Sequence, residues 1–272
     1  MARAPAADWR GDHQLWIEVF VAANFGGLVL DIYLAHSENG FRRSSEYIPL
    51  YFSAAAPIML LAGMALRRWS EAAWKDVGYL IGWLAVLIGL TGVVLHLDSQ
   101  FFHERTLRSL TYAAPFAAPL AYTGLGLLLI MNRMVKPDDV EWAQWVLLLA
   151  LGGFAGNFVF SLSDHAMNGF FDPLEWVPVV SSAFAVSFLL LSLLARVNRR
   201  FLMWCAAVLA AQGLVGLLGF ALHLRAVIRQ PAASLFERLL TGAPPMAPLL
   251  FPNLVILGLI GLWTLGRRES SP

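Results

Sequence analysis

Charged residues are scarce in this chain of 272 amino acids: they make up 14% of the sequence, and the formal net charge is only +1. The Lys and Arg residues are scattered and form no basic face, which argues against a nucleic-acid partner. Cysteine is nearly absent too. The single Cys205 excludes an intrachain disulfide, and its apolar neighbours in the sequence indicate a thiol that packs as a small hydrophobic group.

Sequence signatures of soluble enzymes are also missing. The chain contains no phosphate-binding glycine loop, no nucleophile elbow, no HExxH motif and no Cys-x-x-Cys-His motif. These absences exclude the enzyme classes that such motifs identify, together with a soluble type of catalytic domain.

Apolar residues dominate instead, at 58% of the chain with a mean hydropathy of +0.65. Eight apolar runs each approach the roughly 20 residues that cross a bilayer as a helix, and they lack the period-two alternation of a membrane barrel. We therefore expect an all-α, polytopic integral membrane protein with eight transmembrane helices. The runs lie at about 16–34, 48–66, 77–96, 112–131, 143–163, 177–195, 202–222 and 247–265.

Three motifs occur twice, which indicates an internal repeat. The run HSENGFRRSSEYIP (His36–Pro49) returns as HAMNGFFDPLEWVP (His165–Pro178) at an offset of 129, GLTGVVLHL returns as GLLGFALHL, and APFAAPL returns as APPMAPL. Four spans per unit is an even number, so the two units are predicted to be parallel four-helix repeats related by an axis along the membrane normal. The predicted domains are an N-terminal tail at 1–15, a first repeat at 16–134, and a second repeat with a short C-terminal tail at 135–272.

The distribution of positive charge predicts the orientation. Twelve of the 19 Lys and Arg residues fall in the two tails and in the second, fourth and sixth connections between spans. By the positive-inside rule both termini are then cytoplasmic, and the chain is a multi-pass protein of the cell membrane. The opposite, outer connections are longer and hold most of the histidines, so we expect function on the outer face.

The repeated GLxGxxLHL motif is the first candidate site. Its two glycines and its histidine are spaced by three and four residues, so they share one helix face. A flat ligand such as haem could lie on the glycines while the histidine coordinates it; alternatively, small residues at this spacing let membrane helices pack closely. The residues are Gly89, Gly92 and His96 in the first unit and Gly216, Gly219 and His223 in the second.

His36 and His165 end the first helix of their units. In an up-down-up-down bundle the first and third helices stand diagonally across the core, so we expect His36 to face His96 and His165 to face His223. Two opposed imidazoles can hold haem iron or contribute to a transition-metal site, although histidines at helix ends can also serve only as solvated polar groups.

The remaining residues of the long motif suggest supporting roles. The Asn-Gly pair after each histidine is typical of a turn with positive φ. Glu46 and Glu175 precede proline-started helices, where a carboxylate favours the helix dipole or could orient an imidazole. Further candidates for a polar path or for supporting the histidines are the ionisable residues Asp31, Asp98, His103 and Asp164.

Taken together, these patterns favour a membrane protein whose outer-face histidines bind haem or a transition metal, as a subunit or redox partner of a membrane complex. The bilayer itself and other subunits of such a complex are the expected partners. A transporter or channel for a small solute, an intramembrane enzyme and a purely structural subunit remain alternatives.

Overall fold

The computed structural model describes residues 12–195 and 197–268, so the expected tails at 1–15 and at the C-terminal end lie largely outside the described residues. Every regular element in the described ranges is helical. The α-helices are α1 (His13–Ser37), α2 (Tyr47–Leu66), α3 (Glu71–Asp98), α4 (Phe101–Glu104), α5 (Leu107–Thr111), α6 (Leu120–Met134), α7 (Val140–Met167), α8 (Trp176–Leu194), α9 (Arg199–Arg229), α10 (Leu235–Thr241) and α11 (Leu250–Arg268). Short 3₁₀ turns precede α2, α8 and α11: η1 (Ser44–Glu46), η2 (Pro173–Glu175) and η3 (Ala247–Leu249).

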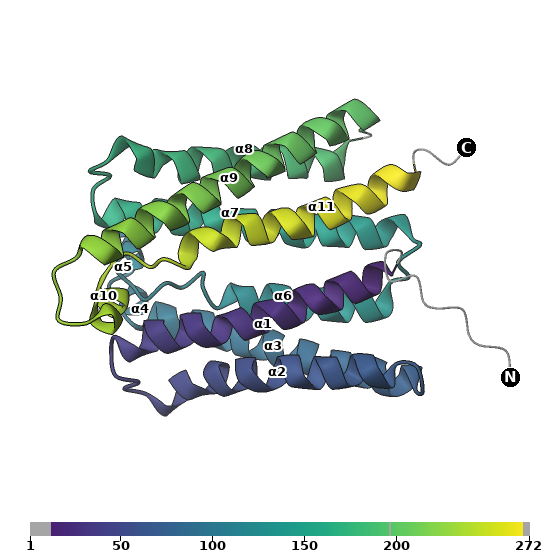
Figure 1. The fold of residues 1–272 in the computed structure, drawn as a ribbon, viewed down its shortest axis with the longest axis horizontal. Coiled ribbons are helices and arrows are strands. Elements are labelled where there is room, and N and C mark those ends of the chain that lie inside the picture. The colour runs from purple at the N-terminus through teal and green to yellow at the C-terminus, as the bar shows by residue number, and fades with distance from the viewer. Residues whose placement is uncertain (1–11, 196, 269–272) are drawn as a thin grey trace, which may run out of the picture.

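The long helices form two groups that lie side by side (Figure 1). In one group α1 packs on α2, α2 on α3, α3 on α6, and α6 back on α1. In the other group α7 packs on α8, α8 on α9, α9 on α11, and α11 back on α7. Each group is thus a ring of four helices in which the first and third stand diagonally.

Seven helical segments in the described part are long and apolar enough to cross a membrane, which establishes an all-helical protein with several membrane-type helices. The remaining predicted run, the fourth at 112–131, differs from its prediction. Its helix α6 starts only at Leu120 and has 15 residues, because Pro115 and Pro119 lie in the turns before it. Proline has no N–H to donate within a helix, so the chain between Tyr112 and Pro119 winds in turns.

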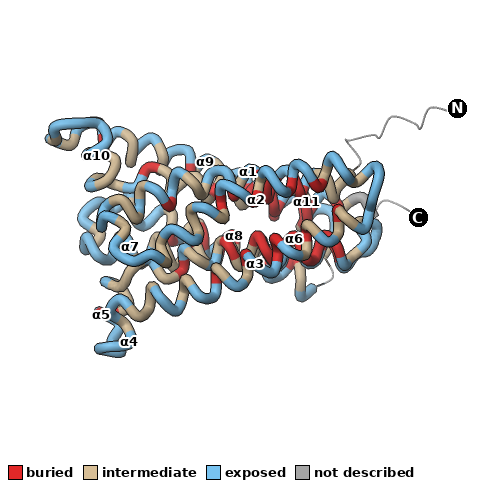
Figure 2. The backbone as a smooth tube through the Cα atoms, turned by 90° about the horizontal axis from the view of Figure 1, so that it is seen from below, coloured by how far each residue is buried: buried red, intermediate tan, exposed pale blue. Residues whose placement is uncertain are grey.

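Buried residues line the inner sides of the helices, where the elements face one another (Figure 2). Many large apolar side chains on the outer sides are exposed, among them Tyr51, Ile58 and Trp204. The groups meet along α6 with α7 and α1 with α11, and Asn24 Nδ2 donates to Asn253 Oδ1 across that contact at 3.1 Å. An apolar exterior around polar pairs is the arrangement expected in a bilayer, where water cannot satisfy buried polar groups.

The helix ends separate into two layers. The ends of α1 and α3 and the start of η1 lie with the short helices α4, α5 and α10 at one end of the molecule (Figure 1). The starts of α1, α3 and α7 and the ends of α2 and α6 lie at the opposite end. The first end holds the four histidines of the repeated motifs, and we call it the histidine end.

Candidate functional site

The four predicted histidines form two pairs at the histidine end. The ring centroids of His36 and His96 are 6.3 Å apart, and those of His165 and His223 are 6.5 Å apart. The rings of each pair are steeply inclined, by 75° and 89°. The structure thus brings together the same two imidazoles that the diagonal placement of first and third helices predicted in each unit.

In the third helix of each group, one ring nitrogen is held by a main-chain carbonyl. His96 Nδ1 lies 2.9 Å from the oxygen of Pro115, and His223 Nδ1 lies 2.8 Å from that of Pro244. A carbonyl oxygen can only accept, so Nδ1 carries the proton and donates it. In the neutral ring Nε2 is then the unprotonated nitrogen, which is the form that binds a metal.

The histidines at the ends of α1 and α7 each lie beside a carboxylate. His36 Nδ1 lies 3.4 Å from Glu46 Oε2, and His165 Nδ1 lies 3.6 Å from Glu175 Oε2. These side chains are mostly buried, with 20% exposure for His36 and 13% for Glu46. Both separations are ion-pair distances and not hydrogen bonds; the carboxylate lies on the Nδ1 side of the ring, so Nε2 is the nitrogen that stays available as a ligand atom. Each glutamate thus lies next to the imidazole that it could orient.

The turn between each histidine and its glutamate explains the rest of the long motif. Gly40 and Phe41 both adopt positive φ, at 72° and 50°, and Gly169 and Phe170 do so at 73° and 51°. Phe41 N–H donates to the carbonyl of His36 at 3.0 Å, which closes the helix end. The reversed chain stacks Phe41 on Tyr47, with centroids 4.5 Å apart, and this aromatic follows Glu46 directly. The Asn-Gly turn predicted from the sequence is therefore present, and it carries the glutamate back to the histidine.

The four glycines beside the third-helix histidines do not face an open groove. A Cβ added at Gly92 would lie 2.7 Å from Pro119 Cβ, and one added at Gly219 would lie 2.9 Å from Pro248 Cβ. At Gly89 and Gly216 an added Cβ would meet the backbone of the next element, 2.8 Å from the Pro119 oxygen and 2.6 Å from the Pro248 oxygen. The start of the fourth helix of each group, together with the turn before it, thus occupies the face on which a macrocycle was expected to lie. The geometry is that of the packing alternative, because only glycine permits so close an approach.

The other predicted residues lie outside the histidine pairs. Asp31 is exposed on α1, and His103 is exposed on the short helix α4. Asp98 lies 4.0 Å from Arg43 Nη1, in a partly exposed ion pair. Asp164 precedes His165 but lines a separate hollow between the segment that precedes α6 and helix α7. Asp31, Asp98 and His103 therefore have no direct place in the candidate site, whereas Asp164 is close enough to His223 to interact with it electrostatically.

The donor set limits the metals that the site fits. Within residues 12–195 and 197–268, no three or more His, Cys, Asp or Glu side chains are grouped so that they could hold a metal ion. A tetrahedral structural zinc needs four protein ligands, so it does not fit. By ligand type, two imidazoles suit haem iron, which receives its equatorial ligands from the macrocycle, or a copper ion of low coordination number. A macrocycle would have to lie elsewhere than on the four glycines, because that face is filled.

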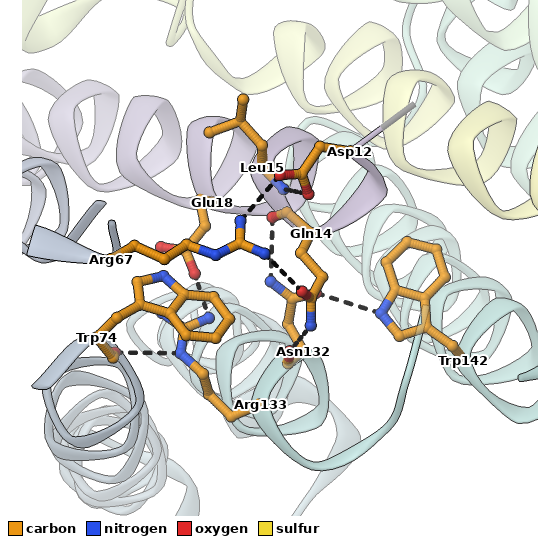
Figure 3. Close-up of polar contacts among 9 residues, drawn as sticks. All are labelled: Asp12, Gln14, Leu15, Glu18, Arg67, Trp74, Asn132, Arg133 and Trp142. Carbon is orange, nitrogen blue, oxygen red and sulfur yellow. Dashed lines mark hydrogen bonds and ion pairs between the residues drawn. The ribbon is translucent and has the colours of Figure 1, made fainter. Parts of the chain in front are cut away.

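A second polar cluster, at the opposite end of the molecule, was not recognised from the sequence (Figure 3). Arg133, in the last turn of α6, forms an ion pair with Glu18 of α1, and both side chains are only 1% exposed. The guanidinium lies over the Trp74 ring with Cζ 3.7 Å from its centroid, and a Cβ at Gly78 would overlap it. The sequence did contain a signal for this ion pair. At an offset of 129, Glu18 and Arg133 of the first unit correspond to Leu147 and Leu262 of the second, so the two opposite charges occur in the first unit alone.

Hydrogen bonds extend this cluster to neighbouring helix ends. Arg67 donates to Asp12 at 2.9 Å and to Gln14 at 3.0 Å. Asn132 accepts from the indole of Trp142 at 3.2 Å, and its own amide donates to the Gln14 carbonyl at 3.1 Å. Because Trp142 belongs to α7, the network also joins the two helix groups.

Comparison of the chain with protein-family models, with curated proteins and with solved structures finds no match.

Proposed function

We propose that each histidine pair binds one transition metal through its two Nε2 atoms, as haem iron or as a bare ion, and that the protein serves electron transfer within a membrane complex. The observation that carries the proposal is the arrangement at Nδ1. Nδ1 of His96 and of His223 is hydrogen-bonded to a main-chain carbonyl at 2.9 and 2.8 Å, and Nδ1 of His36 and of His165 faces a glutamate oxygen at 3.4 and 3.6 Å. Fixing Nδ1 in this way leaves Nε2 free to bind a metal.

The spacing of the rings also supports the proposal. Metal–imidazole bonds are about 2.0–2.1 Å long, so a metal roughly in line with two rings would separate their centroids by about 6 Å. The two pairs have separations of 6.3 and 6.5 Å. Two pairs of this kind at one membrane surface suit a redox role better than a structural one, because two-ligand metal sites lack the full protein coordination of structural sites.

We further propose that the chain crosses the membrane eight times as two parallel four-helix repeats. Three kinds of contact recur at equivalent positions: His36 with Glu46, His96 with the carbonyl of Pro115, and Gly92 with Pro119 have counterparts in the second unit. In this proposal α6, together with the turns before it, makes the eighth crossing. The positive-inside rule would place both termini in the cytoplasm of a cell-membrane protein and the histidine end outside.

Single and double histidine variants test the proposal. His96→Ala or His223→Ala should remove about half of the metal that co-purifies with the wild-type protein, and the double variant should remove nearly all of it. His103→Ala is the matched control, because that histidine is exposed at the same end and belongs to neither pair. Elemental analysis gives the metal content, and the absorption spectrum separates haem from a bare ion.

Wild-type metal content and absorption in the double variant would contradict the proposal. In that case transport of a small solute, the alternative left open by the sequence, becomes the function to measure in liposomes.

A further inference from the structure

The end of the molecule opposite to the histidines has a cavity of about 410 Å³ whose lining is strongly cationic. Arg67, Lys75, Arg133 and Lys136 line it, with Glu71 as the single lining carboxylate. These residues come from the end of α2, the first turn of α3 and the end of α6, so the cavity lies at the level of the helix ends. That is the depth at which lipid phosphates lie in a bilayer.

The charges around the cavity do not balance. Three of the four cations have a carboxylate partner: Arg67 pairs with Asp12, Lys75 with Glu71, and Arg133 with Glu18. Lys136 has no such partner among the described residues. The four lining cations, taken together with the three carboxylates that pair with them, therefore carry one surplus positive charge, which a singly charged oxyanion would neutralise.

A hydrogen-bond donor in the cavity wall is also unsatisfied. Trp74 is 2% exposed, and its indole Nε1 is buried without a hydrogen-bond partner. Arg67 and Arg133 both lie over the Trp74 ring, with Cζ atoms 4.6 and 3.7 Å from the centroid (Figure 3). Burying an indole N–H without an acceptor is costly, so the cavity favours an occupant that accepts a hydrogen bond.

We infer that this cavity binds a phosphate oxyanion that carries one negative charge, with Lys136, Lys75 and the indole N–H of Trp74 as its contacts. Basic pockets between membrane helices bind lipid headgroups by the same chemistry. A phosphodiester headgroup and free inorganic phosphate share this chemistry, and a titration with each of them separates the two. The inference does not depend on the proposed metal sites, which lie at the other end of the molecule.

The test is a titration of the full-length protein in a neutral detergent, followed by native mass spectrometry and by the thermal unfolding temperature. The probes are short-chain phosphatidylglycerol, short-chain phosphatidylcholine and inorganic phosphate. We expect one equivalent of phosphatidylglycerol to bind and to raise the unfolding temperature, with phosphatidylcholine much weaker. Tighter binding of inorganic phosphate than of phosphatidylglycerol would support the same site with the free anion as its ligand.

Variants assign the binding to the cavity. Lys75→Gln and Lys136→Gln should each weaken it about fivefold, as expected for one cation near an anionic headgroup, whereas Lys75→Arg and Lys136→Arg should retain it. Trp74→Phe keeps the aromatic ring between the cations but removes the N–H, so it should weaken binding several-fold without lowering stability in the absence of ligand. Arg229→Gln, at the histidine end, is the control and should have no effect.

Equal binding of phosphatidylcholine and phosphatidylglycerol, or unchanged affinities in Lys136→Gln and Trp74→Phe, would overturn the inference. To check that each variant is folded, its unfolding temperature without ligand is compared with that of the wild-type protein.

Discussion

The buried ion pair between Glu18 and Arg133 permits a quantitative prediction, because the second unit provides a natural comparison. Both side chains are 1% exposed, and at an offset of 129 their counterparts are the buried Leu147 and Leu262. The perturbations are therefore Glu18→Leu, Arg133→Leu and the double variant, each of which installs the residue that the second unit already has.

Each single variant leaves one buried charge without its partner, which costs about 3–5 kcal/mol. The double variant removes both charges together, and apolar replacements of buried ion pairs are often neutral or stabilising. Leucine is shorter than arginine and leaves a gap beside Gly78, so we expect the double variant to lie within about 2 kcal/mol of the wild type. The expected coupling energy between the two sites is then several kcal/mol.

The assay is reversible unfolding in mixed micelles, with the free energy of unfolding determined for the wild type and the three variants as a double-mutant cycle. Single variants that each cost less than about 1 kcal/mol, with an additive double variant, would refute the reasoning, because the two charges would then be solvated independently of one another.

Three further predictions concern the histidine end and the topology. Glu46→Gln and Glu175→Gln should each lower the metal affinity of their own unit by about 10–100-fold in a chelator competition, because the amide orients the imidazole less strongly than a carboxylate; unchanged affinity would assign the glutamates to helix capping alone. Gly92→Leu and Gly219→Leu should each lower the free energy of unfolding by about 1–3 kcal/mol, through overlap with Pro119 and Pro248, and wild-type stability would show that these helices do not pack as described. In a protein whose buried Cys205 is replaced, a cysteine at the exposed Ser44 should react with an impermeant thiol reagent from outside the cell, and one at the exposed Ser70 should not; the reverse labelling would invert the orientation.

Much of the fold could be predicted from hydropathy, because membrane helices are continuous apolar runs with few charges. One predicted helix boundary was wrong, because hydropathy does not take account of the missing N–H group of proline. Residues 112–119 are apolar enough for a span, yet Pro115 and Pro119 keep them out of α6. The fold class is therefore readable from composition, whereas the start of that helix depends on two missing N–H groups.

The candidate site was partly predictable from the repeat. The pairing of His36 with His96 and of His165 with His223 followed from the order of helices in an antiparallel bundle. The role of the glycines could not be decided, because a glycine face serves a ligand or a neighbouring helix equally well until the neighbour's position is known. In the structure Pro119 lies against Gly89 and Gly92, and Pro248 lies against Gly216 and Gly219, so the glycines serve helix packing.

The polar cluster around Glu18 and Arg133 was not predicted, for a different reason. Arg133 lies at the end of a predicted span, and from the sequence its charge was interpreted only as a sign of the cytoplasmic side. Only the packing of α6 against α3 and α1 shows that its guanidinium turns inward to Glu18 and Trp74. Contacts between residues 115 positions apart cannot be read from local periodicity.

The most direct test of the central claim is the metal content of the wild-type protein, purified without added chelator, together with its absorption spectrum. We expect about two equivalents of iron or copper per chain, with a Soret band if the metal is haem iron. A colourless protein that contains no transition metal, and that takes up none when haem or copper is supplied, would contradict it.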